Sequence, residues 1–258
     1  MITEENQLTT LQTDYIKKYG MITAPLYYYF AQFVKQKAQY PIFVSYRSGY
    51  PIEHALDHIG VESKPLWINI DVSEKLELPI VWDYCQQQGL DAPFTFVDNG
   101  YKGTIPSKLT QSSLRPTFQT LLLQKGMYME HSDVLSLLYS EKHGYATATY
   151  AENAPKKYKA YNEDIFHRTE NGTVTVSPQE KSAFDQQIFQ TFFDGMTDGY
   201  ALCKNKEFFP QYYEVIKNAA LVSIDSDFFP GLKDEKLSVF KQTEKLSRCF
   251  DQVQKVFA

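Results

Sequence analysis

Short apolar runs alternate with amphipathic segments along the first half of the chain. Continuous apolar runs, which are typical of buried strands, occupy residues 42–45, 66–70 and 94–97. Apolar positions at helical spacing predict helices over residues 25–39, 52–59 and 79–88, with a further helix starting near Pro106. We place Pro25 in the first turn of its helix, where a missing N–H costs no hydrogen bond. Strands that alternate with helices in this way form a parallel sheet with right-handed crossovers and helices on both faces.

The second half of the chain carries longer helical segments and one hairpin signal. The run 118–123 is too short for its periodicity to distinguish a strand from a helix. Asn171-Gly172 between two alternating runs is a strong signal for a β-hairpin. Helical spacing predicts helices over residues 131–142, 179–203, 207–219 and 233–257. We therefore expect an α/β fold: a parallel sheet flanked by helices over residues 1–130, and a mostly helical part with a small hairpin over residues 131–258.

Composition and charge exclude several classes of protein. With 26 Lys and Arg against 31 Asp and Glu, the net charge is −5, which argues against general binding to nucleic acid. No apolar run reaches the ~18 residues of a membrane span, and the start of the chain lacks the basic and apolar regions of a secretory signal. We therefore expect a cytoplasmic protein whose three cysteines are reduced thiols. The 19 Tyr, 18 Phe and 2 Trp indicate an aromatic-rich core or, alternatively, a platform on which bases or sugars stack.

The segment after the apolar run 42–45 carries the first candidate ligand-binding residues, Tyr46, Arg47, Ser48 and Gly49. In a parallel sheet this segment lies at the carboxyl edge, where ligands bind. Arg47 would clamp a phosphate or carboxylate, and Gly49 would let the backbone approach the ligand closely. The helix that follows would offer free N–H groups to an anion. An ordinary strand-to-helix turn with a solvated arginine is the alternative.

The segment after the apolar run 94–97 carries the second set: Asp98, Asn99, Gly100, Tyr101, Lys102, Gly103 and Thr104. Its two glycines permit a nest of backbone N–H groups for phosphate. Asp98 would hold Mg²⁺ or ribose hydroxyls, Lys102 would balance phosphate charge, and Thr104 would bind the anion or cap the next helix. Both sets should open on one sheet edge and form a crevice for a phosphorylated sugar or a nucleotide. A structural Asp/Gly turn is the alternative.

Both segments resemble ligand loops of the type I phosphoribosyltransferases. Residues 43–51, with the helix after them, resemble the first ligand loop of that family, and residues 96–104 resemble a shortened form of its diphosphate-sugar loop. The family usually carries two adjacent acids in the latter loop, and the second position is Asn99 here. The resemblance implies a glycosyl-transfer enzyme in which Asp98 and Lys102 are catalytic and Asp98 holds a magnesium ion.

A longer resemblance covers residues 15–110. It is to the region after the hydrolase domain in bacterial proteins of surface-glycan gene clusters, which are labelled haloacid-dehalogenase-type hydrolases. The matching residues are Tyr19-Gly20, Pro25-Leu26, Phe30, Arg47-Ser48-Gly49-Tyr50 and Val97-Asp98-Asn99-Gly100-Tyr101-Lys102-Gly103-Thr104. That family usually has Asp at the position of Ser48. Ser48 and Asn99 thus leave a second interpretation open: a catalytically degenerate regulator, or a module that binds a protein partner, as an effector does.

Overall fold

The chain folds into two compact units, each assembled from separate stretches of sequence. The computed structural model describes residues 8–46, 49–101, 103–112, 116–126, 134–140, 154–204, 206–207, 209–219 and 236–258. The helical unit comprises Met1–Ala31, Tyr145–Lys157 and Lys181–Ala258, and the sheet unit comprises Gln32–Gly144 and Tyr158–Glu180. These bounds differ from the expected division after residue 130, because the sheet takes a strand from beyond that point and the hairpin segment belongs to the sheet unit.

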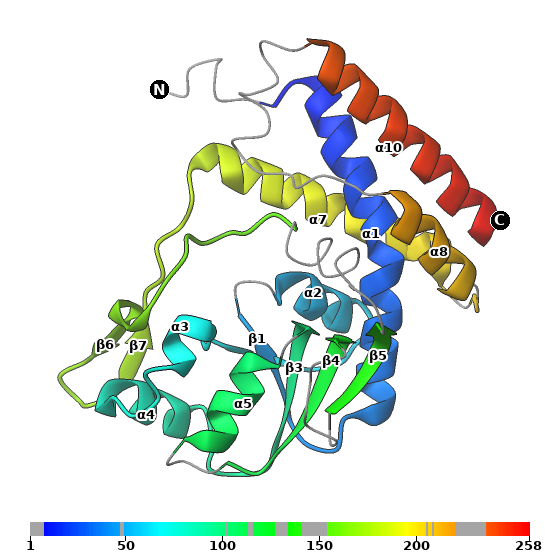
Figure 1. The fold of residues 1–258 in the computed structure, drawn as a ribbon. Coiled ribbons are helices and arrows are strands. Elements are labelled where there is room, and N and C mark those ends of the chain that lie inside the picture. Colours follow the sequence, from blue (N-terminus) through cyan, green and yellow to red (C-terminus); the bar gives the residue numbers. More distant parts are fainter. Residues whose placement is uncertain are drawn as a thin grey trace. The chain divides into compact units, whose positions relative to one another are not determined.

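Five parallel strands form the main sheet of the sheet unit (Figure 1). They are β1 (Ile42–Ser45), β2 (Lys64–Leu66), β3 (Phe94–Tyr101), β4 (Phe118–Gly126) and β5 (Val134–Ser140). Their order is β2-β1-β3-β4-β5, and every neighbouring pair is parallel. The predicted α/β fold with a parallel sheet is therefore confirmed, and the undecided run 118–123 belongs to strand β4.

Strand β5 lies where we predicted a helix over residues 131–142, so that prediction is wrong. Val134 and Leu138 are buried, and their four-residue spacing imitates the period of a helix. Parallel pairing with β4, in which Leu135 lies opposite Leu121, outweighs this local pattern. The flanking residues of that prediction, 131–133 and 141–142, lie outside the described residues.

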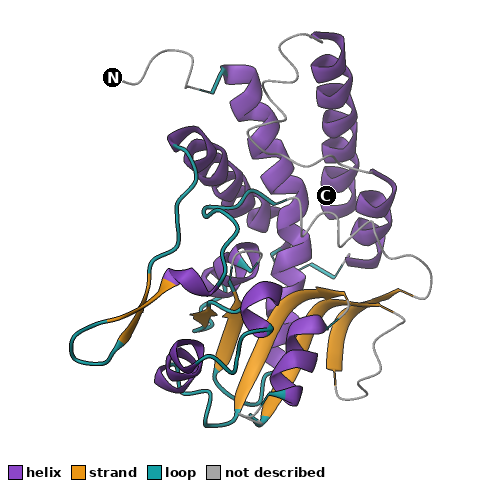
Figure 2. Ribbon diagram, turned by 60° about the vertical axis from the view of Figure 1, so that its left-hand side comes forward, coloured by secondary structure: helices purple, strands orange, loops and turns teal. Residues whose placement is uncertain are grey.

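Four helices connect the strands of this sheet: α2 (Tyr50–His58), α3 (Ile70–Ser73), α4 (Pro79–Gln87) and α5 (Thr104–Gln111). The helices expected between the strands are confirmed, whereas the strand expected over residues 66–70 ends at Leu66. It ends there because the Asn69 side chain accepts the N–H of Val72 at 2.8 Å and caps α3. Right-handed crossovers place α2 on one face of the sheet and α3, α4 and α5 on the other (Figure 2).

A buried core joins α3, α4 and α5 to the sheet. The rings of Phe94 and Phe118 stack with their centroids 5.3 Å apart, and Phe43 meets Phe94 edge-on at 5.6 Å. Val81 of α4 and Leu109 of α5 are fully buried members of the same core. Tyr84 belongs to the same core, and its hydroxyl accepts the backbone N–H of Trp67 at 2.9 Å, so this buried polar group has a partner.

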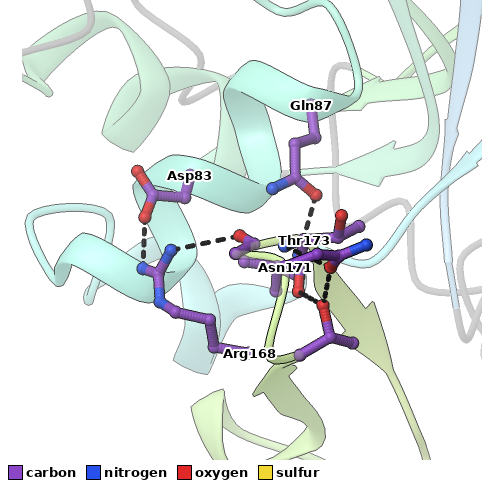
Figure 3. A network of polar contacts seen from close by, with 8 residues as sticks. Asp83, Gln87, Arg168, Asn171 and Thr173 are labelled. Carbon is purple, nitrogen blue, oxygen red and sulfur yellow. Dashed lines mark hydrogen bonds and ion pairs between the residues drawn. The ribbon is translucent and has the colours of Figure 1, made fainter.

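A small hairpin, β6 (Phe166–Arg168) and β7 (Val174–Val176), belongs to the same unit. Its turn contains Gly172 at φ 84°, a conformation that favours glycine, so the predicted hairpin is confirmed. The hairpin lies against α4: Arg168 forms an ion pair with Asp83, and the Val174 N–H donates to Gln87 Oε1 at 2.9 Å (Figure 3). These contacts attach a segment from late in the chain to the sheet unit.

The helical unit contains α7 (Ala183–Cys203), α8 (Phe209–Ala219), α10 (Lys236–Phe257) and the first part of α1 (Thr10–Lys37). The mostly helical C-terminal part is therefore confirmed. Our placement of Pro25 in a first turn is wrong, because α1 begins at Thr10 and Pro25 lies inside it. A proline there removes the N–H that the Met21 carbonyl would normally accept. The neighbouring carbonyl, that of Ile22, accepts a hydrogen bond from the Tyr212 hydroxyl at 2.7 Å, so contacts from α8 support this turn.

Helices α1 and α7 approach each other closely enough for their backbones to touch. A Cβ atom on Gly195 would lie 2.1 Å from the Lys17 carbonyl oxygen, and one on Gly20 would lie 2.1 Å from the Phe192 carbonyl oxygen. Only glycine permits such an approach. Within the described part of the chain, none of the helices is both long and apolar enough to cross a bilayer.

Candidate functional site

The strand ends that carry the two predicted segments lie next to each other. β1 and β3 are parallel neighbours with Val44 opposite Val97, so Ser45 and Asp98 come level at the carboxyl edge. The prediction that both segments open on one edge of one sheet is therefore confirmed. β2 lies on one side of β1 and β3 on the other, so the strand order reverses here. Ligands of open α/β sheets bind at such a point.

The second segment begins as a strand and not as the loop that we expected. β3 continues beside β4 through Tyr101. Because successive residues of a strand point to opposite faces, Asp98 lies on the α5 side with Phe94, and Asn99 lies on the α2 side. The Asp98 carboxylate accepts the backbone N–H of Asn99 at 2.9 Å. The two side chains therefore leave the strand in opposite directions.

Two glycines lead from β3 into α5. Gly100 has φ 86° and Gly103 has φ 64°, both in the left-handed region. A Cβ atom on Gly100 would lie 2.4 Å from the Gln124 carbonyl oxygen, so a larger residue would displace β4. Gly103 occupies the N-cap of α5, which overturns the expectation that Thr104 caps this helix. The first turn of α5 has no acidic side chain, so its N-terminal N–H groups suit an anion.

The first segment turns from β1 into α2 at Gly49. A Cβ atom on Gly49 would lie 2.1 Å from the Ser45 carbonyl oxygen, so this turn requires glycine. Glu53 lies in the first turn of α2 and adds negative charge there, so this helix start suits an anion less than that of α5. Three of the predicted site residues, Arg47, Ser48 and Lys102, lie outside the described residues.

Five aromatic side chains gather beside the end of β1, and we call them the edge aromatic cluster: Tyr46, Tyr50, Trp67, Tyr158 and Tyr161. The Tyr46 ring centroid lies 4.2 Å from that of Tyr50 and 4.5 Å from that of Trp67. The ring centroid of Tyr158 lies 5.2 Å from that of Trp67, and the Tyr161 hydroxyl donates to the Tyr46 backbone carbonyl at 2.7 Å. Tyr46 and Tyr161 are 115 positions apart, so no local pattern in the sequence could have revealed this cluster.

Glu53 brings a half-buried carboxyl group to the edge aromatic cluster. Burial raises its pKa above the ordinary value of 4.5, a hydrogen bond with the Tyr46 hydroxyl opposes this shift, and the charge of Asp57 adds to it. Burial also raises the pKa of the Tyr46 and Tyr50 hydroxyls, which therefore remain protonated at neutral pH. Sequence reasoning missed Glu53 as a site residue. The high tyrosine content was the available signal for this region.

A cavity of about 430 Å³ lies beside the edge aromatic cluster and shares Tyr161 with it. Asp71 and Asp164 both border this cavity. Two carboxylates would repel a phosphate group, so this cavity does not suit the anionic part of a ligand.

The three cysteines are free and buried. Burial raises the thiol pKa of Cys85 and Cys203 to about 12 and that of Cys249 to about 11. Thiols that remain protonated at neutral pH are poor nucleophiles. Among the residues that the structure describes, no group of three or more His, Cys, Asp or Glu side chains is placed to hold a metal ion.

No family model, curated protein or solved structure matches this chain. A proposal for its function therefore has to start from the geometry of the carboxyl edge.

Proposed function

We propose that the protein binds a phosphorylated sugar or a nucleotide at the carboxyl edge between β1 and β3. The observation that carries this proposal is the position of both glycine-containing segments where the strand order reverses. Phosphate groups would bind at residues 100–104, where two glycines precede a helix start without acidic side chains. Arg47 and Lys102 would add positive charge from the two segments.

The proposed reaction is glycosyl transfer from a phosphorylated sugar, as in the type I phosphoribosyltransferases that the two segments resemble. Such a transfer depends on positioning and on stabilising the charge of the departing phosphate more than on a nucleophile. Lys102 would neutralise part of that charge. Asp98 would hold a magnesium ion, which supplies further positive charge when it is bound.

One observation favours a second candidate function, that of a catalytically degenerate regulator or a module for a protein partner. Asp98 is followed by Asn99, which carries a neutral amide, so a metal ion at this strand end would meet one carboxylate and not two. A protein that retained the ligand site and lost the metal would bind the same ligands without turning them over.

Calorimetric titration of the full chain with nucleotides and sugar phosphates tests the binding proposal. Arg47→Ala should weaken binding by about 1.5–3 kcal/mol, the contribution of a hydrogen bond to a charged group. Arg168→Ala is the matched control, because Arg168 belongs to the hairpin, and it should bind as the parent does. Equal affinities for Arg47→Ala and the parent would reject the arginine clamp.

The same titrations with and without magnesium test the metal. Asp98→Asn should abolish any magnesium dependence of ligand binding while the circular dichroism spectrum stays unchanged. An unaltered magnesium dependence would make Asp98 a structural residue of β3. Binding of a sugar diphosphate without release of its diphosphate, in assays that also contain nucleobases as nucleophilic acceptors of the sugar, would favour the regulatory function over the transferase.

A further inference from the structure

The edge aromatic cluster is more exposed than the core of the same unit, except at Tyr161, which belongs to both. The core under α3, α4 and α5 buries phenylalanines such as Phe94 and Phe96 together with Tyr84 and Tyr161, all at most 5% exposed. Tyr46, Tyr50 and Tyr158 are only half-buried, and each carries a hydroxyl group. Tyrosine and tryptophan are the aromatic residues favoured where one end of the side chain stays wet. Tyr46, Trp67 and Tyr158 therefore keep part of their surface accessible to a ligand beside the core.

Glu53 adds a second and independent feature. Partial burial of a carboxyl group costs free energy, and the packing of aromatic rings gains nothing from it. An ionised carboxylate offers about four acceptor sites on its two oxygens, of which the Tyr46 hydroxyl needs one. Acceptor capacity beside a set of aromatic faces matches a ring that stacks and also donates hydrogen bonds.

We propose that the edge aromatic cluster and Glu53 bind the ring of the ligand, by stacking on Tyr158 or Trp67 and by accepting hydrogen bonds from that ring at Glu53. The chemical class is a ring with adjacent donors, which a sugar diol and the N–H edge of guanine both supply. This inference deepens the proposed function and rests on it for the position of the phosphate, which the negative charge of Glu53 directs toward α5.

Tyr161 is a positioning residue in this arrangement. Its hydroxyl donates to the Tyr46 carbonyl at 2.7 Å, and its own carbonyl accepts the Asn69 side-chain N–H at 2.7 Å. Lys75 and Glu163 form an ion pair two residues further along. The segment that carries Tyr158 is thereby held against the ends of β1 and β2, so a contact residue from late in the chain reaches the sheet edge.

Titration calorimetry of the full chain with four probes tests this inference: guanosine 5′-monophosphate, adenosine 5′-monophosphate, guanosine and inorganic phosphate. Tyr158→Ala should weaken binding of both nucleotides about tenfold, because each base loses one aromatic stacking partner. Its affinity for inorganic phosphate should equal that of the parent. Tyr40→Ala is the matched control, because Tyr40 is 39% exposed in the same unit but precedes β1 at the opposite edge. It should change neither affinity.

Glu53→Gln identifies the donor on the ring. About tenfold weaker binding of the guanine nucleotide alone would assign the donors to the base, and equal weakening of both nucleotides would assign them to the ribose diol. Either result supports the inference. Unchanged nucleotide affinities in both Tyr158→Ala and Glu53→Gln would overturn it and leave the proposed function standing. If guanosine bound as tightly as guanosine 5′-monophosphate and Tyr158→Ala weakened its binding, the inference would be supported and the proposed function rejected. If none of the probes bound, both would be rejected.

Discussion

Several tyrosines at the carboxyl edge of the sheet unit are more exposed than those in the core of the helical unit. In the helical unit Tyr19, Tyr27 and Tyr200 have no exposed surface. Tyr212 is also fully buried, and its hydroxyl donates a hydrogen bond to a backbone carbonyl of α1. At the carboxyl edge of the sheet unit the rings of Tyr46 and Tyr158 are only half-buried. A tyrosine count therefore does not distinguish buried packing residues from partly exposed ones, whereas the exposure of each side chain does.

Glycine shows the same division. Gly195 and Gly20 lie in helices and allow two backbones to touch, which is a matter of packing. Gly100 and Gly103 lie at the sheet edge with positive φ, which shapes the chain where a ligand would bind. In the helical unit glycine is required because it lacks a side chain, and at the sheet edge it is required because it can adopt a positive φ.

The largest effect that we expect is on packing in the helical unit. Alanine in place of glycine in a helix ordinarily stabilises by ~0.5–1 kcal/mol. Gly195→Ala should instead lower the free energy of unfolding by about 3 kcal/mol, because its Cβ atom would overlap the Lys17 carbonyl and force the helices apart. Urea denaturation measures this loss. Gln190→Ala, at an exposed position of α7, is the control and should change stability by less than ~0.5 kcal/mol. A more stable Gly195→Ala variant would show that the two helices do not touch at this residue.

Much of the fold could be predicted because the signals for it are local. Prolines and glycines mark the ends of α2 and α4, short apolar runs mark β1 and β3, and the Asn-Gly pair marks the hairpin. The alternation of strands and helices then requires parallel pairing, and parallel pairing brings the two strand ends together at one edge. This is why the place of the candidate site followed from the sequence.

The errors have a common cause in contacts between distant segments. Strand β5 and the extension of β3 to Tyr101 form because both pair with β4. The spacing of apolar residues along the sequence does not reveal which strands pair. Pro25 lies inside α1, next to a turn whose Ile22 carbonyl accepts the hydroxyl of Tyr212, almost two hundred positions away in the sequence. The edge aromatic cluster joins residues 115 positions apart, such as Tyr46 and Tyr161, so it could be found only in the folded chain.

The second prediction compares two tyrosine hydroxyls that each donate to a backbone carbonyl at 2.7 Å. Tyr212→Phe should cost about 1–2 kcal/mol in the free energy of unfolding, because it removes a donor from a fully buried carbonyl. Tyr161→Phe should cost less, about 0.5–1 kcal/mol, because its hydrogen bond is only partly buried and water can replace it. Thermal and urea denaturation measure both. The reverse order would mean that the edge aromatic cluster, and not the helical unit, depends more on its hydroxyls for stability.

A smaller effect is expected at the hairpin. Arg168 and Asp83 form an ion pair whose side chains are 45% and 31% exposed, and such pairs contribute ~0.2–1 kcal/mol. Arg168→Met should therefore lower the free energy of unfolding by about 0.5 kcal/mol, and the loss should shrink in high salt. Arg248→Met removes the exposed pair with Glu244 inside one helix and is the matched control. A loss above about 2 kcal/mol for Arg168→Met alone would make this pair a main support of the hairpin.

The smallest effect is a change in the pH dependence of stability, and it has opposite signs for two glutamates of the sheet unit. Burial raises the pKa of Glu53 above 4.5, so the folded state retains its proton longer than the unfolded state does. The free energy of unfolding contributed by Glu53 therefore falls as the pH rises from 4.5 through the raised pKa. The Lys75 ammonium lowers the pKa of Glu163, whose contribution is present above 4.5 and is lost as the pH falls through the lowered pKa. Urea denaturation between about pH 3 and pH 7 should show Glu53→Gln gaining stability relative to the parent as the pH rises, and Glu163→Gln losing it. If both variants changed in the same direction, Glu53 would not be held in the partly buried, aromatic surroundings on which its role in ring binding depends.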